Sequence, residues 1–152
     1  MIVAPIDPAD PRVTPLLAAS DAYHRALYPP ESCHLEGVEA LQLPNVHFVA
    51  ALDGTAVIAC GAVKVMADDG HYGEVKRVFV PPEWRGRGLS RLVMEVLERH
   101  LVTQGVRIAR LETGPLQPEA LGLYRRLGYA ERTPFGRYAP DPLSIFMEKQ
   151  LA

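Results

Sequence analysis

The pattern of apolar and polar positions divides the chain into a strand-rich first part and a second part in which helices and strands alternate. Alternating or continuous apolar runs predict four strands in the first part, at residues 2–5, 46–52, 55–66 and 72–80. Asp53-Gly54 is a favoured two-residue turn, so the second and third segments are expected to form a hairpin. With the fourth segment they predict an antiparallel meander.

Apolar residues that recur every three or four positions predict helices. Three segments show this spacing, at residues 10–28, 89–104 and 118–127, and a short helix is one interpretation of residues 35–41. Asp10-Pro11 is expected to begin the first helix, because Asp is a favoured cap and Pro suits the first helical position. Gly105 is expected to end the second.

Three further strands are predicted late in the chain, at residues 106–112, 129–133 and 143–149. The first of these follows a helix, so it is expected to pair in parallel with the strand before that helix. The 152 residues, 48% of them apolar, suit one domain over residues 1–152. The order predicts an α+β (mixed α/β) fold with a central, mostly antiparallel sheet of six to seven strands and about four helices.

Charge and composition narrow the classes of function. A net charge of −2 and a pI near 6.2 argue against nucleic acid as a partner. The chain shows neither a signal peptide nor a run of about 20 apolar residues, so we expect a cytoplasmic protein without a membrane segment. Cys33 and Cys60 are too few for a disulfide framework, and the five histidines lack metal-ligand spacing, so no metal is expected.

The segment from Val78 to Arg91 carries the strongest chemical signal. A strand ends, the turn Arg85-Gly86-Arg87-Gly88 follows, and a helix begins. Free backbone N–H groups and the helix dipole make such a helix start an anion site, and three arginines add positive charge. The segment lacks the Gly-Lys-Ser/Thr of a P-loop, and Arg91 breaks the dinucleotide pattern G-x-G-x-x-G. A plain basic turn is the alternative.

This segment resembles the pyrophosphate loop of the GNAT superfamily of N-acetyltransferases, Gln/Arg-x-x-Gly-x-Gly/Ala. Arg85 to Leu89 fit that pattern, and Ser90 replaces the final small residue. Downstream, Leu123 to Tyr129 is similar to the family's Leu-Tyr-x-x-x-Gly-Phe/Tyr, while Gln117 replaces its usual Asn. The two motifs lie in the family's order within residues 74–129. The later pattern Phe135-Gly136-x-Tyr138 looks like that of small bacterial-type members.

The resemblance implies a site for acetyl-CoA. Backbone amides of the loop would bind the pyrophosphate, and the preceding strand end would bind the pantetheine arm, with the N–H of Val80 as the oxyanion donor. The implied cofactor-binding residues are Val78, Phe79, Val80, Arg85, Gly86, Arg87, Gly88, Leu89, Ser90, Arg91, Gln117 and Tyr124.

Acetyl transfer to an amine needs a proton acceptor and a proton donor. The resemblance makes Tyr124 the donor to the CoA sulfur; a core aromatic is its alternative. Glu112 and Glu74 are the two candidate bases, and an ordered water chain is a third possibility. Glu74 could instead form a surface ion pair within Glu74-Val75-Lys76-Arg77.

The acceptor side is expected near the first helix and the loop after it, which in the family covers the acceptor site. Tyr28, Glu31, Ser32 and His34 are the candidates, and a polar loop without substrate contact is the alternative. If Glu31 points into the cleft, a cationic amine would suit the site.

The sequence is thus interpreted as an acetyltransferase that moves the acetyl group of acetyl-CoA to a small-molecule amine by direct attack in a ternary complex. A non-catalytic acyl-CoA-binding module or sensor is the alternative. RNA binding by the arginines is disfavoured by the acidic balance. The oligomeric state is open, with a homodimer among the alternatives.

Overall fold

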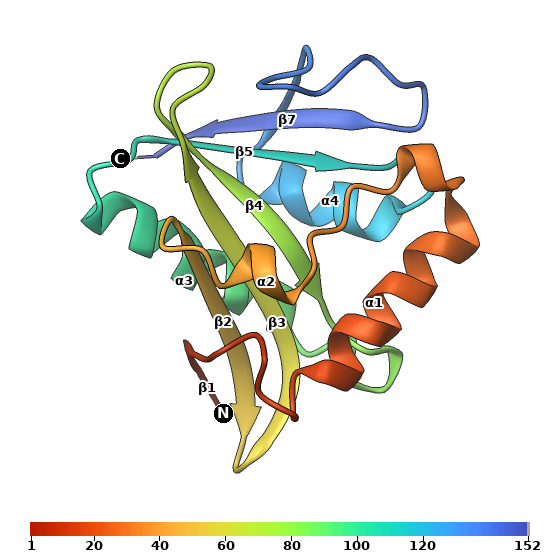
Figure 1. Ribbon diagram of the computed structural model, residues 1–152, viewed down its shortest axis with the longest axis vertical. Coiled ribbons are helices and arrows are strands. Elements are labelled where there is room, and N and C mark those ends of the chain that lie inside the picture. The colour runs from red at the N-terminus through yellow and green to blue at the C-terminus, as the bar shows by residue number, and fades with distance from the viewer. Residues whose placement is uncertain (152) are drawn as a thin grey trace.

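The computed structural model describes residues 1–151, which form a seven-stranded sheet with helices on both faces (Figure 1). The strands are β1 (Ile2–Pro5), β2 (Val46–Asp53), β3 (Ala56–Met66), β4 (Tyr72–Phe79), β5 (Ile108–Thr113), β6 (Ala130–Arg132) and β7 (Ile145–Gln150). The helices are α1 (Thr14–Leu27), α2 (Val38–Leu41), α3 (Leu89–Thr103) and α4 (Pro118–Arg126), with 3-10 turns η1 (Pro30–Ser32) and η2 (Pro82–Trp84).

The strands lie in the order β1-β2-β3-β4-β5-β7-β6. All paired neighbours within residues 1–151 are antiparallel except β4 and β5, which pair in parallel as predicted from the intervening helix. The predicted fold class is therefore confirmed. The insertion of β7 between β5 and β6 was not predicted.

Several boundaries differ from the predictions: α2, β5 and β7 begin two or three residues later than predicted, and two further differences have a local cause. Helix α1 begins at Thr14, because the Asp10 carboxylate accepts the Arg12 N–H at 2.9 Å and pairs with its guanidinium at 2.9 Å in a turn before the helix. Pro15 takes the early helical position expected for Pro11. The first hairpin turns at residues 54–55 rather than 53–54, since Asp53 still pairs with Ala56.

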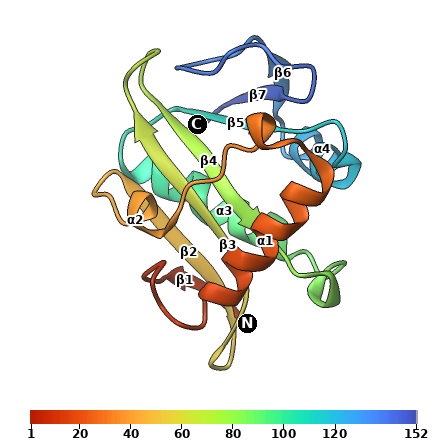
Figure 2. The same cartoon turned by 45° about the vertical axis from the view of Figure 1, so that its right-hand side comes forward.

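Helices lie on both faces of the sheet (Figure 2), and an apolar cluster is buried on each face. Helices α3 and α4 cover one face, where Val93 and Leu97 pack with Val49 and Val63. Helices α1 and α2 cover the other face, where they meet alternate residues of the same strands; this cluster includes Leu17, Leu41, Phe48, Cys60 and Phe79. Both faces of the central strands are thus buried, which explains their long apolar runs.

Strands β4 and β5 pair only at residues 73–75 and 109–111 among the described residues, and then they separate (Figure 1). The register of β4 against β3 shifts by one residue at this point, and Arg77 adopts a positive φ of 58°. Such a bulge bends a strand. The Arg77 guanidinium donates to Asp21 Oδ1 of α1 at 2.7 Å, which ties the bent strand to that helix. The separation leaves an opening between the two strands.

Candidate active site

Two cavities meet where β4 and β5 separate. The larger, about 420 Å³, runs past the end of β4, the loop before α3, and α4. The smaller, about 100 Å³, lies among α1, β4, β5 and the segment before β7. Five residues line both cavities: His24, Val78, Gln117, Ala120 and Tyr124. A molecule bound in one cavity can therefore contact a molecule bound in the other.

The larger cavity ends at a helix start suited to an anion. Gly86 and Gly88 adopt left-handed φ values of 79° and 74°, which ordinary side chains disfavour. A Cβ atom at either glycine would meet no described atom within 4 Å, so backbone conformation rather than packing requires glycine here. No described side chain caps α3, so the first N–H groups of this helix are free for a ligand.

The three arginines of this segment, two in the loop and Arg91 in α3, have different roles. Arg85 donates from Nε to the Val80 carbonyl at 3.0 Å, which braces the loop against the end of β4. Arg91 lines the cavity and donates to Glu95 Oε1 at 3.3 Å. Arg87 lies over the Trp84 ring, 4.6 Å from its centroid and outside the cavity lining. The Arg87 side chain therefore does not line the site. Arg126 of α4 does line the larger cavity, although it was not predicted from the sequence.

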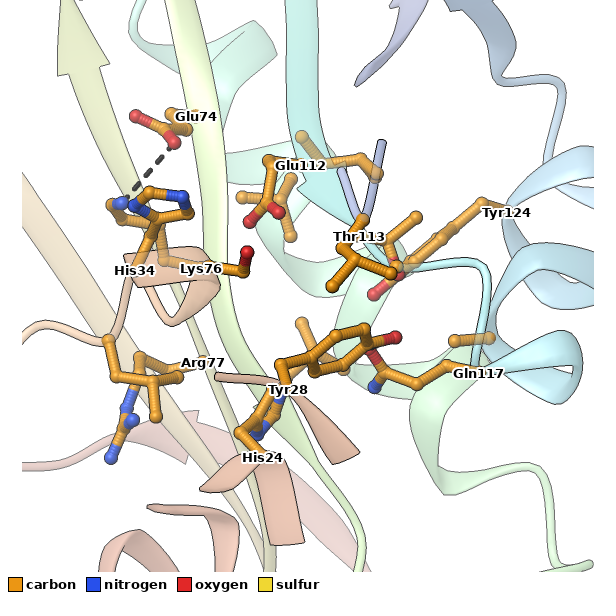
Figure 3. Close-up of a pocket in the computed structure, with 18 of the residues that line it drawn as sticks. His24, Tyr28, His34, Glu74, Lys76, Arg77, Glu112, Thr113, Gln117 and Tyr124 are labelled. Carbon is orange, nitrogen blue, oxygen red and sulfur yellow. Dashed lines mark hydrogen bonds and ion pairs between the residues drawn. The ribbon is translucent and has the colours of Figure 1, made fainter. Parts of the chain in front are cut away.

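Tyr124 reaches the junction of the cavities from α4 (Figure 3). Burial, with a smaller contribution from the charge of Glu112, raises the pKa of its phenol to about 12. Tyr124 also packs edge-on against Tyr129. A phenol with this pKa keeps its proton at neutral pH, so it can act as a donor.

Tyr28 closes the junction from the opposite side. Its hydroxyl donates to Gln117 Oε1 and accepts the Leu116 N–H, both at 3.2 Å. The ring lies so close to Gly114 that a Cβ atom there would be 1.9 Å from the Tyr28 oxygen. Gln117, which replaces the family's usual Asn, is therefore held between the end of α1 and the start of α4.

Glu112 stands in the wall of the smaller cavity at the end of β5 (Figure 3). Burial raises the pKa of its carboxyl to about 7, against the opposing effects of the Ser144 hydroxyl and the charge of Lys76. A carboxyl with this pKa exchanges protons readily at neutral pH. Glu112 therefore has the properties of an acid–base group.

Glu74 is engaged by its neighbours. Its side chain is buried, accepts the Tyr138 hydroxyl at 2.5 Å and pairs with the Lys76 ammonium at 3.2 Å. The ion pair considered from sequence thus exists, but it is buried rather than on the surface. Glu74 and Glu112 both line the smaller cavity, but these contacts occupy the Glu74 carboxylate.

The predicted acceptor residues divide into two groups. Tyr28, Ser32 and His34 line the smaller cavity, and Ser32 donates to Asp141 Oδ2 at 2.6 Å. Glu31 is exposed, outside the lining of both cavities, so a cationic acceptor cannot be argued from it.

Several lining residues were not assigned to the site from sequence. His24 and Tyr23 of α1 face the cavities, and Lys76 and Tyr138 complete the smaller one. Helical spacing places His24 one turn before Tyr28, which is a usable signal. The others depend on how distant segments dock, which one sequence does not show.

Other chemistries find less support. Burial raises the pKa of the Cys60 thiol to about 12, so it is a poor nucleophile. Within residues 1–151 no group of three or more His, Cys, Asp or Glu side chains could hold a metal ion. Among the helices described, none is both long and apolar enough to span a bilayer.

The comparisons with known proteins place this fold among acyltransferases. The family model described as "Acetyltransferase (GNAT) family" matches residues 15–129. An IAA acetyltransferase of Azospirillum brasilense is 42% identical over 149 residues, covering 98% of this chain and 97% of that protein. The chain therefore belongs to the GNAT acetyltransferase family, and the resemblance stated from sequence is confirmed.

Solved structures agree with this assignment. A Klebsiella pneumoniae protein described as an acyl-CoA N-acyltransferase has a TM-score of 0.83 and 34% identity, covering 99% of this chain and 97% of that one. PaiA N-acetyltransferase from Thermoplasma acidophilum, solved with coenzyme A, shares the fold with a TM-score of 0.72 at 15% identity, covering 98% of both chains. The protein is thus classed as an acetyl-CoA-dependent N-acetyltransferase.

Proposed function

We propose that the protein transfers the acetyl group of acetyl-CoA to an amine of a small molecule by direct attack in a ternary complex. The observation that carries this proposal is the meeting of the two cavities at Tyr124, with Glu112 in the wall of the smaller one. The larger cavity, with its uncapped helix start, suits the cofactor, and the smaller one suits a compact acceptor. We expect the enzyme to act in the cytoplasm as a single domain.

The chain's own groups fit acetyl-CoA. The N–H groups of residues 86–91 would hold the pyrophosphate, and the backbone of residues 78–80, beyond the β4–β5 pairing, would hold the pantetheine arm. The bound cofactor supplies a thioester-activated acetyl group. The N–H of Val80 would donate to the thioester oxygen as negative charge develops there.

Two side chains would move protons. A free alkylammonium has a pKa of about 10, so the acceptor must lose a proton before its nitrogen can attack. Glu112, with a pKa of about 7, would accept that proton directly or through water. Tyr124 would donate its proton to the sulfur as the carbon–sulfur bond breaks. Glu74, held by Lys76 and Tyr138, is the weaker candidate for the base.

The test is release of free thiol from acetyl-CoA over a panel of amines. IAA is tested beside the amines as a separate candidate acceptor, because the relative from Azospirillum brasilense is named for it. We expect acceptor-dependent release, with intersecting initial-rate lines that indicate a ternary complex. Parallel lines would indicate a covalent enzyme intermediate and contradict direct attack. Tight CoA binding without release for any acceptor would favour a non-catalytic acyl-CoA-binding module.

A further inference from the structure

Lys76 and Glu112 occupy matching positions on adjacent strands. Val75 of β4 and Leu111 of β5 are the last pair of the parallel ladder, and Lys76 and Glu112 are the next residues along the two strands. Opposite residues of a parallel pair point to the same face of the sheet. Both side chains line the smaller cavity, where the strands begin to separate (Figure 3).

The Lys76 ammonium is held by oxygens from three separate segments. It pairs with Glu36 Oε1 and Glu74 Oε2, each at 3.2 Å, and it donates to the Tyr138 hydroxyl at 3.2 Å. Only 11% of its side chain is exposed. A lysine is ordinarily flexible, so this threefold attachment fixes a positive charge at one place in the wall.

We propose that Lys76 is a positioning residue for the reaction, whose fixed ammonium group stabilises the ionised form of Glu112 in the acceptor cavity. The inference rests on the proposed role of Glu112 as the base. It gives the Glu36–Lys76–Glu74–Tyr138 network a role beyond packing, because the network fixes the ammonium in the wall of the cavity that Glu112 also lines.

Among the described residues around Glu112, Lys76 is the cation placed to stabilise the ionised carboxylate. Burial, Glu74 and Asp141 all oppose ionisation of the Glu112 carboxyl, whereas the neutral Ser144 hydroxyl and the charge of Lys76 favour it. The guanidinium of Arg77 is directed to Asp21 Oδ1 and the Leu17 carbonyl. Titratable and charged groups around the cavity, taken from every adjoining element, are His24, Tyr28, His34, Glu36, Glu74, Lys76, Arg77, Tyr124, Tyr138 and Asp141.

The experiment compares Lys76→Met with the wild-type enzyme by two measurements. Carbon-13 NMR of the glutamate carboxyls, with the Glu112 signal assigned from Glu112→Gln, gives the pKa of Glu112 directly. The pH dependence of kcat/KM gives the pKa on which catalysis depends. We expect the NMR pKa to rise by roughly one unit, since nearby opposite charges shift a pKa by about one to three units. The acid limb of the pH profile of kcat/KM should move to higher pH by the same amount. The value of kcat/KM at pH 7 should then fall about fivefold.

Matched variants separate charge from structure. Lys76→Arg should restore most of the wild-type profile. Lys64→Met removes a second lysine that pairs with Glu36, at 3.7 Å, but lies outside the cavity lining, so it should leave both measurements unchanged. Lys76→Gln serves as a second neutral variant if Lys76→Met does not fold, as checked by circular dichroism and CoA affinity.

An unchanged NMR pKa of Glu112 in a folded neutral variant would overturn the inference. An equal rise in the pKa of Glu112 in Lys64→Met would also overturn the inference, because the rise would then follow from the loss of any nearby lysine. If the NMR pKa rises but the acid limb of the pH profile stays in place, the electrostatic effect of Lys76 on Glu112 stands, whereas the proposed role of Glu112 as the base fails.

Discussion

Replacing Glu112 with Gln should make the protein more stable at neutral and alkaline pH. The raised pKa of Glu112 means that the folded state opposes its ionisation, so the ionised form destabilises the fold. One pKa unit corresponds to about 1.4 kcal/mol. A rise from 4.5 to about 7 therefore corresponds to a loss of roughly 3 kcal/mol in the free energy of unfolding.

The sign of this effect fixes its pH window. Below pH 4.5 the carboxyl is protonated in both the folded and unfolded states, so Glu112→Gln and wild type should have similar stability. As the pH rises from 4.5 to 7, the unfolded chain releases the proton first, and the wild type should lose stability relative to the variant. Above pH 7 the difference should stay constant.

Urea denaturation at half-unit steps from pH 4.5 to 8.5 measures this difference. Glu39→Gln, which removes an exposed carboxylate of α2, is the matched control and should track the wild type. A pH-independent difference, or a less stable Glu112→Gln at pH 8, would refute the assignment of a raised pKa to Glu112.

Three further substitutions test the parts of the site. Gly88→Glu should abolish CoA binding in calorimetry, because it places a carboxylate by the diphosphate and forces a side chain into φ +74°; near-native affinity would contradict the loop assignment. Tyr124→Phe should lower kcat by roughly 100-fold with little change in CoA affinity, and an unchanged kcat would remove Tyr124 from the mechanism. Gly114→Ala should raise the acceptor KM and lower the free energy of unfolding by about 1–3 kcal/mol, because the added Cβ atom displaces the Tyr28 ring. If both values are unchanged, the Tyr28 ring does not pack closely against residue 114.

The elements of the fold were predictable because their apolar periods are strong. The helix after Gly88 and the hairpin of β2 and β3 follow directly from spacing and turn residues. The start of α1 was mispredicted because Asp10 hydrogen-bonds within the preceding turn, a choice that local sequence does not reveal. The bulge at Arg77 was equally hidden, since a positive φ at a residue other than glycine has no sequence signal.

Some parts of the candidate site could also be predicted from the sequence, and others could not. The loop and Tyr124 lie within contiguous motifs, so their places could be read along the chain. The choice between Glu112 and Glu74 depends on burial and on partners such as Tyr138, which is 64 residues from Glu74 in the sequence. Such contacts arise only when the segment before β7 folds over the cavity.

A structure of the protein with CoA tests the meeting of the two cavities most directly. The CoA pyrophosphate should lie against the N–H groups of residues 86–91, with the thiol sulfur within hydrogen-bond distance of the Tyr124 hydroxyl. A pyrophosphate bound elsewhere, or a sulfur remote from Tyr124 and the cavity of Glu112, would contradict the proposed site.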